Sequence, residues 1–232
     1  MVKRYIILFI VLFICLSFCS KDQNNTGDDI PTVPEFSKRI LMLGRSVMGG
    51  WFVHWGNSNY ASKNRYELFY GEMNSPPDIV NSANGIINQR NIDATWAVFF
   101  KFCFVDFDVY DQNEANQKLN ELKNYVEQIR QEVRTKRNAY LIIATALPEV
   151  YSNTNQYIKW LHQQYNEWVK QLASSDSRIK IFDMYSILVD SNGSLKSNYA
   201  SGPDDAHLNH AAYNALDQQF FPFLNANVKI FN

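Results

Sequence analysis

The segment that decides the fold reads ATWAVFFKFCFV at residues 94–105, then a charged stretch at 114–136, then AYLIIATA at 139–146. The two outer runs are almost entirely apolar, as expected for strands that are covered on both faces of a sheet. In the stretch between them, apolar residues recur at three- and four-residue spacing, which predicts an amphipathic helix: Leu119, Leu122, Val126, Ile129 and Val133.

The same alternation continues outward on both sides of this segment. Strands are expected near 39–44, 95–104, 139–146 and 179–182, with one more somewhere between Tyr66 and Asn81. Further helices are expected at 155–172 and 209–224, the last with Asn209 as its N-cap. Strands that alternate with long helices predict an α/β domain in which helices cover both faces of a parallel sheet. Functional groups of such sheets collect at the carboxyl ends of the strands.

The composition limits the classes of function. The chain has 232 residues, 46% of them hydrophobic and 15% aromatic, which fits one globular domain with a sizeable core. The formal net charge is -1, and no basic run occurs after the first residues. A nucleic-acid partner is therefore not expected, and no protein partner is predicted.

The N-terminus predicts export. Lys3 and Arg4 precede an apolar run at 5–18 that is short for a bilayer-spanning helix, which indicates a signal peptide at 1–18 rather than an uncleaved membrane anchor. The sequence LSFC resembles a bacterial lipoprotein box and implies lipidation of Cys19. Residues 19–35 are polar and interrupted by prolines, as in a flexible tether, and the folded domain is expected at 36–232. The expected location is the bacterial cell envelope, with the membrane contacted through the lipid.

Two segments carry the residue types of nucleophilic catalysis. Ser46 lies in LMLGRSVMGG at 41–50, just after the first expected strand. Asp204 and His207 lie in GPDDAHLNHAAY at 202–213, before the last expected helix, and Asp205 is a second candidate for the carboxylate. A serine hydroxyl becomes a strong nucleophile when an imidazole takes its proton and a carboxylate fixes the imidazole tautomer.

These segments resemble the SGNH/GDSL hydrolase superfamily. GRSV stands in place of the GDSL block, the D-x-x-H block is intact, and TALP at 145–148 is similar to a segment that many members carry. The resemblance implies a three-layer α/β/α sandwich with a flavodoxin-like sheet. It also implies Ser46 as nucleophile, His207 as general base and Asp204 as the carboxylate that orients it. Arg45 replaces an aspartate that lies outside the triad, so Arg45→Asp is expected to do less harm than the loss of a triad residue.

The oxyanion hole is where the sequence departs most from this family. Gly85 is the candidate for the glycine N–H of the second block, although Asn84-Gly85 equally suits a turn. Cys103 stands where the third block has an asparagine, and Lys101 lies two residues earlier on the same face. The lysine could stabilise an oxyanion, but the favoured interpretation is a side chain that reaches solvent. Trp55 is a candidate platform for substrate, with core packing as the alternative.

The sequence therefore predicts a serine esterase that works through an acyl-enzyme without a cofactor. Its expected substrates are small-molecule or glycan esters, such as acylated envelope or extracellular glycans. The first alternative is a non-catalytic surface binding module on the same fold. The second is a metal-dependent phosphoesterase that uses the H-x-x-H pair of His207 and His210 with the upstream aspartates; metal binding is not expected.

Overall fold

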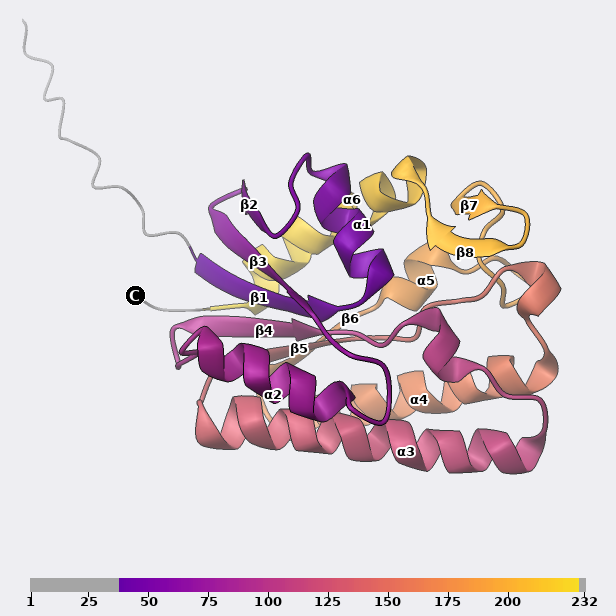
Figure 1. Ribbon diagram of the computed structural model, residues 1–232, viewed down its shortest axis with the longest axis horizontal. Helices are drawn as coiled ribbons and strands as arrows, with labels where there is room; N and C mark the ends of the chain where they lie inside the picture. Colours follow the sequence, from indigo (N-terminus) through magenta and orange to yellow (C-terminus); the bar gives the residue numbers. More distant parts are fainter. Residues whose placement is uncertain (1–37, 230–232) are drawn as a thin grey trace, which may run out of the picture. The chain divides into compact units, whose positions relative to one another are not determined.

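In the computed structural model, which describes residues 38–229, six strands form a central sheet with helices on both faces (Figure 1). The strand order is β2-β3-β1-β4-β5-β6, and every neighbouring pair is parallel except β2 with β3. The five parallel strands follow the flavodoxin-like order. This arrangement confirms the expected α/β class and the mostly parallel sheet. The strands are β1 (Lys38–Gly44), β2 (Tyr60–Lys63), β3 (Tyr66–Glu72), β4 (Trp96–Phe100), β5 (Tyr140–Ala144) and β6 (Ile179–Phe182).

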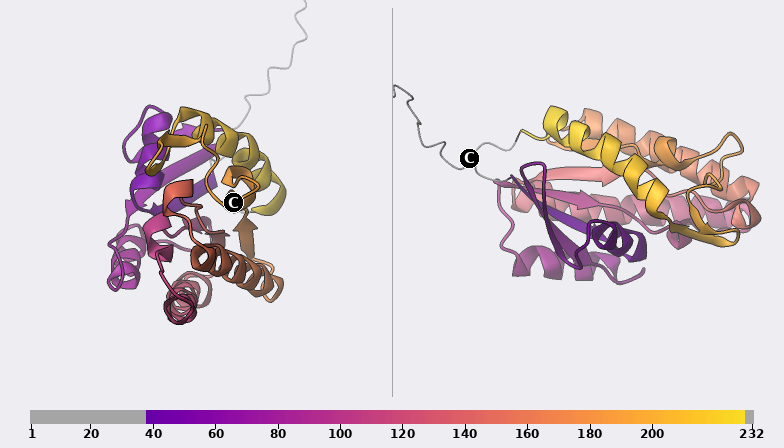
Figure 2. Two further views of the ribbon diagram at one scale, coloured as in Figure 1. Left: turned by 90° about the vertical axis from the view of Figure 1, so that its right-hand side faces the viewer. Right: turned by 90° about the horizontal axis from the view of Figure 1, so that it is seen from above.

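The helices divide into two layers. One layer, with α1, α5 and α6, covers one face of the sheet, and α2, α3 and α4 cover the other (Figures 1 and 2). Side chains of β1 alternate between the two cores: Ile40 and Met42 belong to the first, Leu41 and Leu43 to the second. The helices are α1 (Ser46–His54), α2 (Ile79–Gln89), α3 (Gln112–Arg130), α4 (Gln156–Ser174), α5 (Met184–Leu188) and α6 (His210–Asn227).

Several elements differ from the sequence-based expectations. Strand β4 ends at Phe100, because the chain leaves the sheet there and forms the 3₁₀ turn η1 (Phe104–Phe107). A two-stranded hairpin, β7 (Ala200–Gly202) and β8 (Asp205–Leu208), precedes α6. Helix α3 continues into a π-helical segment, η2 (Gln131–Lys136), and a second 3₁₀ turn, η3 (Tyr151–Asn153), precedes α4. The turn η1 and the β7–β8 hairpin both lie beyond the carboxyl ends of the parallel strands.

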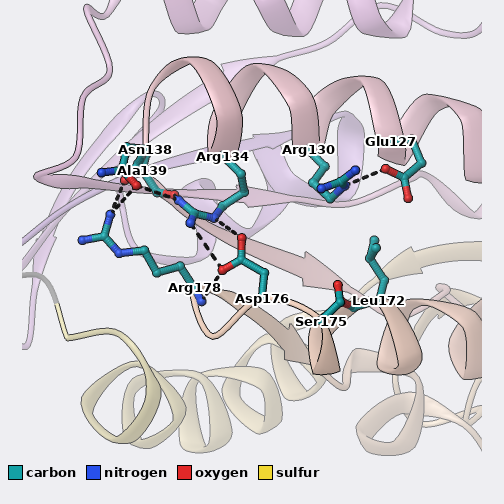
Figure 3. A network of polar contacts seen from close by, with 9 residues as sticks. All are labelled: Glu127, Arg130, Arg134, Asn138, Ala139, Leu172, Ser175, Asp176 and Arg178. Carbon is teal, nitrogen blue, oxygen red and sulfur yellow. Dashed lines mark hydrogen bonds and ion pairs between the residues drawn. The ribbon is translucent and has the colours of Figure 1, made fainter.

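A polar network lies at the amino ends of β5 and β6, opposite the carboxyl ends of the parallel strands (Figure 3). Arg134 Nε donates to Asp176 Oδ2 at 2.8 Å, and Arg134 Nη1 donates to the carbonyl oxygen of Ala139 at 2.6 Å. Arg178 Nη1 donates to Asn138 Oδ1 at 2.9 Å. These contacts join the segments that enter β5 and β6, so they fix the amino ends of these strands. The carboxyl ends remain available for a site.

The expected signal peptide at 1–18, the lipidation site Cys19 and the tether at 19–35 lie outside the described residues. None of the helices between residues 38 and 229 is both long enough and apolar enough to cross a membrane.

Candidate active site

Ser46 is the first residue of α1 and follows the end of β1 by two positions. Arg45 between them has an extended backbone, and its side chain makes no capping bond to the helix. Its carbonyl oxygen accepts from the N–H groups of Met48 (2.7 Å) and Gly49 (3.2 Å). Within residues 38–229, the N–H groups of Ser46 and Val47 have no acceptor. An exposed serine hydroxyl thus lies beside free donors at the positive end of a helix.

Lys101 lies beneath this turn. A Cβ at Gly44 would come within 2.7 Å of Met48 Cβ and 3.2 Å of Lys101 Cε, so the close approach requires glycine. The Lys101 side chain is fully buried, and its Nζ donates to the carbonyl oxygen of Phe102 at 3.3 Å. The expectation that it reaches solvent is wrong, because it points inward under the serine turn. Burial lowers the pKa of Lys101 to about 8, although the charges of Cys103 and Asp106 act in the opposite direction.

Replacing Lys101 with methionine is expected to stabilise the protein in a pH-dependent way. Because the folded-state pKa, about 8, lies below the ordinary 10.5, the unfolded chain binds more protons between these values. The cost of the buried ammonium is therefore present in full below pH 8 and disappears as the pH rises toward 10.5. The free energy of unfolding of Lys101→Met should exceed that of wild type by about 3 kcal/mol at pH 7. Urea unfolding of both proteins at several pH values measures this gap, and a gap that does not shrink above pH 8 contradicts the assignment.

Cys103 lies between β4 and η1 and contacts the serine. Its Sγ lies 3.8 Å from Ser46 Oγ, so the thiol faces the hydroxyl. Its backbone N–H donates to Asp106 Oδ2 at 2.8 Å and is not available to a substrate. Of the groups on Cys103, only the thiol can donate toward a reacting oxygen, and a thiol is a weak donor.

Arg45 joins three segments at the carboxyl edge. Its guanidinium pairs with Asp106 Oδ1 at 2.5 Å and also donates to the hydroxyl of Ser75. The side chains of this ion pair are 13% and 4% exposed, so both charges are largely removed from water. Because Asp106 also accepts from the Cys103 N–H, the ion pair connects the serine turn, the loop after β3 and the cysteine. Neither Ser75 nor Asp106 is among the site residues expected from the sequence.

The structure pairs His207 with Asp205, which corrects the choice of Asp204. Asp205 Oδ1 accepts from the backbone N–H of His207 at 2.9 Å and lies 2.6 Å from its Nδ1. Both residues belong to β8 and are two positions apart, so their side chains project from the same, exposed face. Asp204 lies in the exposed turn between β7 and β8, one position out of this register. The hydrogen bonds from His207 lower the pKa of Asp205.

Ser46 and His207 line one cavity of about 300 Å³. Val53 and Leu208 contribute apolar surface to it. No hydrogen bond joins the serine and the histidine within the described part of the chain, and catalytic hydrogen bonds are often long before substrate binds. The edge of the Phe104 ring packs against His207, with the ring centres 5.2 Å apart. Segments that are far apart in the sequence thus bring a hydroxyl, an imidazole and a carboxylate to one place.

Tyr213 fixes the start of α6 against the start of α1. Its hydroxyl donates to the carbonyl oxygen of Val47 at 3.0 Å, and a Cβ at Gly50 would lie only 2.2 Å from this hydroxyl. Glycine at position 50 therefore permits the contact. Because β8 leads directly into α6, the contact also fixes His207 relative to Ser46.

A second polar chain reaches the same cavity. His210 Nδ1 lies 2.8 Å from His54 Nδ1, and His54 Nε2 lies 3.4 Å from Asp217 Oδ2. Burial lowers the pKa of His54. Trp55 is only 7% exposed and donates its indole N–H to Asp217, so the expectation of a substrate platform at Trp55 is wrong. Its ring belongs to the core between α1 and α6.

Gly85 is not placed to serve an oxyanion hole. It lies inside α2, where a backbone N–H is used by the helix itself, so neither the donor nor the turn that Asn84-Gly85 suggested is present. In the part of the chain that the structure describes, no group of three or more potential ligands could hold a metal ion. His210 of the H-x-x-H pair contacts His54 instead.

Comparison with known proteins agrees with this arrangement. The model of the GDSL-like lipase/acylhydrolase family matches residues 91–220. A solved structure of a lipolytic protein of the G-D-S-L family from Veillonella parvula is 15% identical, with a TM-score of 0.59 over 81% of this chain and 98% of that one. A GDSL-like lipase from Bacteroides thetaiotaomicron is 14% identical, with a TM-score of 0.57 over 82% and 88% of the two chains. A carbohydrate acetylesterase from Sinorhizobium meliloti is 12% identical, with a TM-score of 0.57 over 82% and 99%. No curated protein sequence matches this chain.

A flavodoxin-like sheet with a serine after its first strand and a histidine before its last helix defines the SGNH class of hydrolase folds. This chain belongs to the GDSL-like lipase/acylhydrolase family.

Proposed function

We propose that this protein is a serine esterase that cleaves ester bonds through an acyl-enzyme. The observation that carries the proposal is the shared cavity of Ser46 and His207, with Asp205 on the Nδ1 side of the imidazole. With Nδ1–H directed to the carboxylate, Nε2 is the nitrogen that can accept a proton.

In the first half-reaction, His207 Nε2 takes the hydroxyl proton of Ser46 while Oγ attacks the ester carbonyl carbon. The tetrahedral intermediate collapses, the C–O bond to the alcohol breaks, and the imidazolium returns its proton to the departing alkoxide. In the second half-reaction, His207 removes a proton from water, which attacks the acyl-serine. The second tetrahedral intermediate collapses, the bond between the acyl carbon and Ser46 Oγ breaks, and the imidazolium returns its proton to Oγ. The acid then leaves and Ser46 is regenerated. Asp205 remains ionised and stabilises the imidazolium in both halves.

The negative oxygen of the intermediate would lie at the N-terminus of α1. The free N–H of Ser46 and the helix dipole favour an anion there, and the Cys103 thiol is a further donor. Lys101 is fully buried and would act on this oxygen through its charge rather than by contact. These groups replace the asparagine and the glycine that the SGNH/GDSL resemblance implies.

Acylated glycans are the substrate class that we propose. The fold neighbours include a protein described as a carbohydrate acetylesterase, and the sequence-based expectation of an envelope location would bring the enzyme to such esters.

Labelling with a fluorophosphonate probe tests the nucleophile. The probe phosphonylates serines that a neighbouring base activates, so wild type should be labelled at Ser46 and Ser46→Ala should not. Ser201→Ala, which removes an exposed serine of the β7–β8 hairpin, should be labelled like wild type.

Folded wild-type protein that is not labelled, and that hydrolyses no 4-nitrophenyl ester, would contradict the esterase proposal. That result would favour the binding module, in which the weak Cys103 donor belongs to a site without catalytic power.

A further inference from the structure

A second cavity, of about 460 Å³, is lined in part by Phe104, whose ring packs against His207 of the Ser46 cavity. It lies between η1 and η3, at the ends of the segments that follow β4 and β5. We call it the Glu149 pocket. Its lining includes Phe104, Asp108, Tyr110, Glu149, Ser152 and Asn153. Phe104 also packs against the ring of His207, and the charge of His207 acts on the Glu149 carboxyl, so the pocket lies close to the imidazole of the Ser46 cavity.

Glu149 contributes a buried carboxylate to this lining. The residue is 2% exposed, and its carboxylate accepts from Asn153 Nδ2 at 3.4 Å and from the backbone N–H of Val150. The backbone carbonyl oxygen of Glu149 accepts from the N–H of Leu195 at 2.7 Å, which fixes the backbone at this position. Burial and the charge of Asp108 raise the pKa of Glu149. Burying a carboxyl whose hydrogen bonds come only from the nearby residues Val150 and Asn153 costs free energy, and such groups are common at binding sites.

The lining of this pocket suits a ligand that is rich in hydroxyl groups. The carboxyl groups of Glu149 and Asp108 and the amide of Asn153 offer several acceptors and a donor. Tyr110, which is 79% exposed, adds an aromatic face at the rim. The Ser46 cavity has Val53 and Leu208 in its lining and suits an acyl group better.

We propose that the Glu149 pocket binds the alcohol part of the ester, a sugar, and holds its hydroxyl groups through Glu149 and Asn153. The proposal rests on the esterase function proposed above and adds the position and chemical class of the leaving group. In this arrangement the acyl group occupies the Ser46 cavity and the sugar occupies the Glu149 pocket, and His207 protonates the departing sugar oxygen.

An ammonium group is the other ligand that carboxylates attract, and the two differ in what they require. A hydroxyl needs a hydrogen-bond acceptor, which glutamine also provides. An ammonium group needs the negative charge, which glutamine removes. The variants Glu149→Gln and Glu149→Leu therefore separate the two ligands.

The test compares two acetyl esters: an acetylated methyl xyloside and 4-nitrophenyl acetate, which has no sugar. Glu149→Leu should lower the ratio of kcat/KM for the xyloside to that for 4-nitrophenyl acetate by about tenfold or more, mainly through KM. Glu149→Gln should lower it by less. Glu167→Gln, which removes an exposed carboxylate of α4, should leave the ratio unchanged.

An unchanged ratio in Glu149→Leu overturns the proposal, because the pocket then does not distinguish the sugar. Equal losses in Glu149→Gln and Glu149→Leu, with acetylcholine preferred by wild type, also overturn it and indicate an ammonium site. If wild type hydrolyses neither ester, the esterase function fails on its own. Binding of unacetylated methyl xyloside, followed by NMR, then decides the pocket: binding that Glu149→Leu weakens supports it, and no binding by wild type overturns it.

Discussion

Replacing Asp205 with asparagine is expected to lower kcat for ester hydrolysis by on the order of 10²- to 10³-fold. Asparagine keeps the size of the side chain but can donate to His207 Nδ1, which favours the tautomer that carries its proton on Nε2. That tautomer cannot accept the proton of Ser46. The loss should be smaller than for a fully buried triad carboxylate, because the Asp205 side chain is 50% exposed and water can replace part of its effect.

Asp204→Asn is the matched control for this prediction. It makes the same chemical change one residue away, in the turn between β7 and β8, and should alter kcat by less than about twofold because the residue has no contact with the imidazole. The measurement is the initial rate with a 4-nitrophenyl ester at saturating concentration. A large loss in Asp204→Asn together with a small one in Asp205→Asn would reverse our assignment.

The choice between these aspartates shows what the sequence could and could not provide. The D-x-x-H spacing favours Asp204, and it applies when the segment is a turn. In the structure the segment from Asp205 is a strand, so side chains that share a face are two residues apart rather than three. The segment DAHL has only four residues, and two of them are polar. It therefore cannot be recognised as a strand without its partner β7.

The long elements were predictable because their apolar patterns are continuous. The helix expected at 114–136 appears as α3 with its π-helical extension, and Asn155 and Asn209 cap α4 and α6 through their side chains. Helix α2 was missed because Asn84-Gly85 favours a turn, yet packing of Ile79, Ala83 and Ile87 against the sheet outweighs that local preference. The edge strand β2 was missed because it has no apolar run.

The ion pair between Arg45 and Asp106 could not be predicted, because the two residues are distant in the sequence. Arg45 and Asp106 are 61 residues apart, and nothing in either segment indicates the other. From the sequence, Arg45→Asp is expected to do less harm than the loss of a triad residue, because position 45 lies outside the triad. The ion pair adds a cost in stability that the sequence does not indicate.

Arg45→Ala is expected to lower the free energy of unfolding by about 3 kcal/mol, because it leaves the Asp106 carboxylate buried without its partner. Arg45→Asp should be worse, since it places a second carboxylate beside the first. Arg130→Ala is the matched control: it breaks a pair with Glu127 in which both side chains are more than a third exposed, and should cost less than about 1 kcal/mol. Equal losses in Arg45→Ala and Arg130→Ala, measured by urea unfolding, would show that the buried pair has no special role.

The double variant Arg45→Asp/Asp106→Arg separates stability from activity. The exchange restores opposite charges at the two positions, so the double variant should be more stable than Arg45→Asp alone, with a coupling energy measurable in a double-mutant cycle.

Esterase activity should not return in the double variant, because an arginine at position 106 cannot accept the hydrogen bond from the Cys103 N–H that Asp106 Oδ2 accepts at 2.8 Å. The thiol that faces Ser46 would then lose its fixed position. Asp106→Asn keeps an acceptor for this N–H and loses only the charge, so it should retain more activity per folded molecule than the double variant. If the double variant recovers both properties together, the role of Asp106 is limited to its charge, and the link to Cys103 does not matter for catalysis.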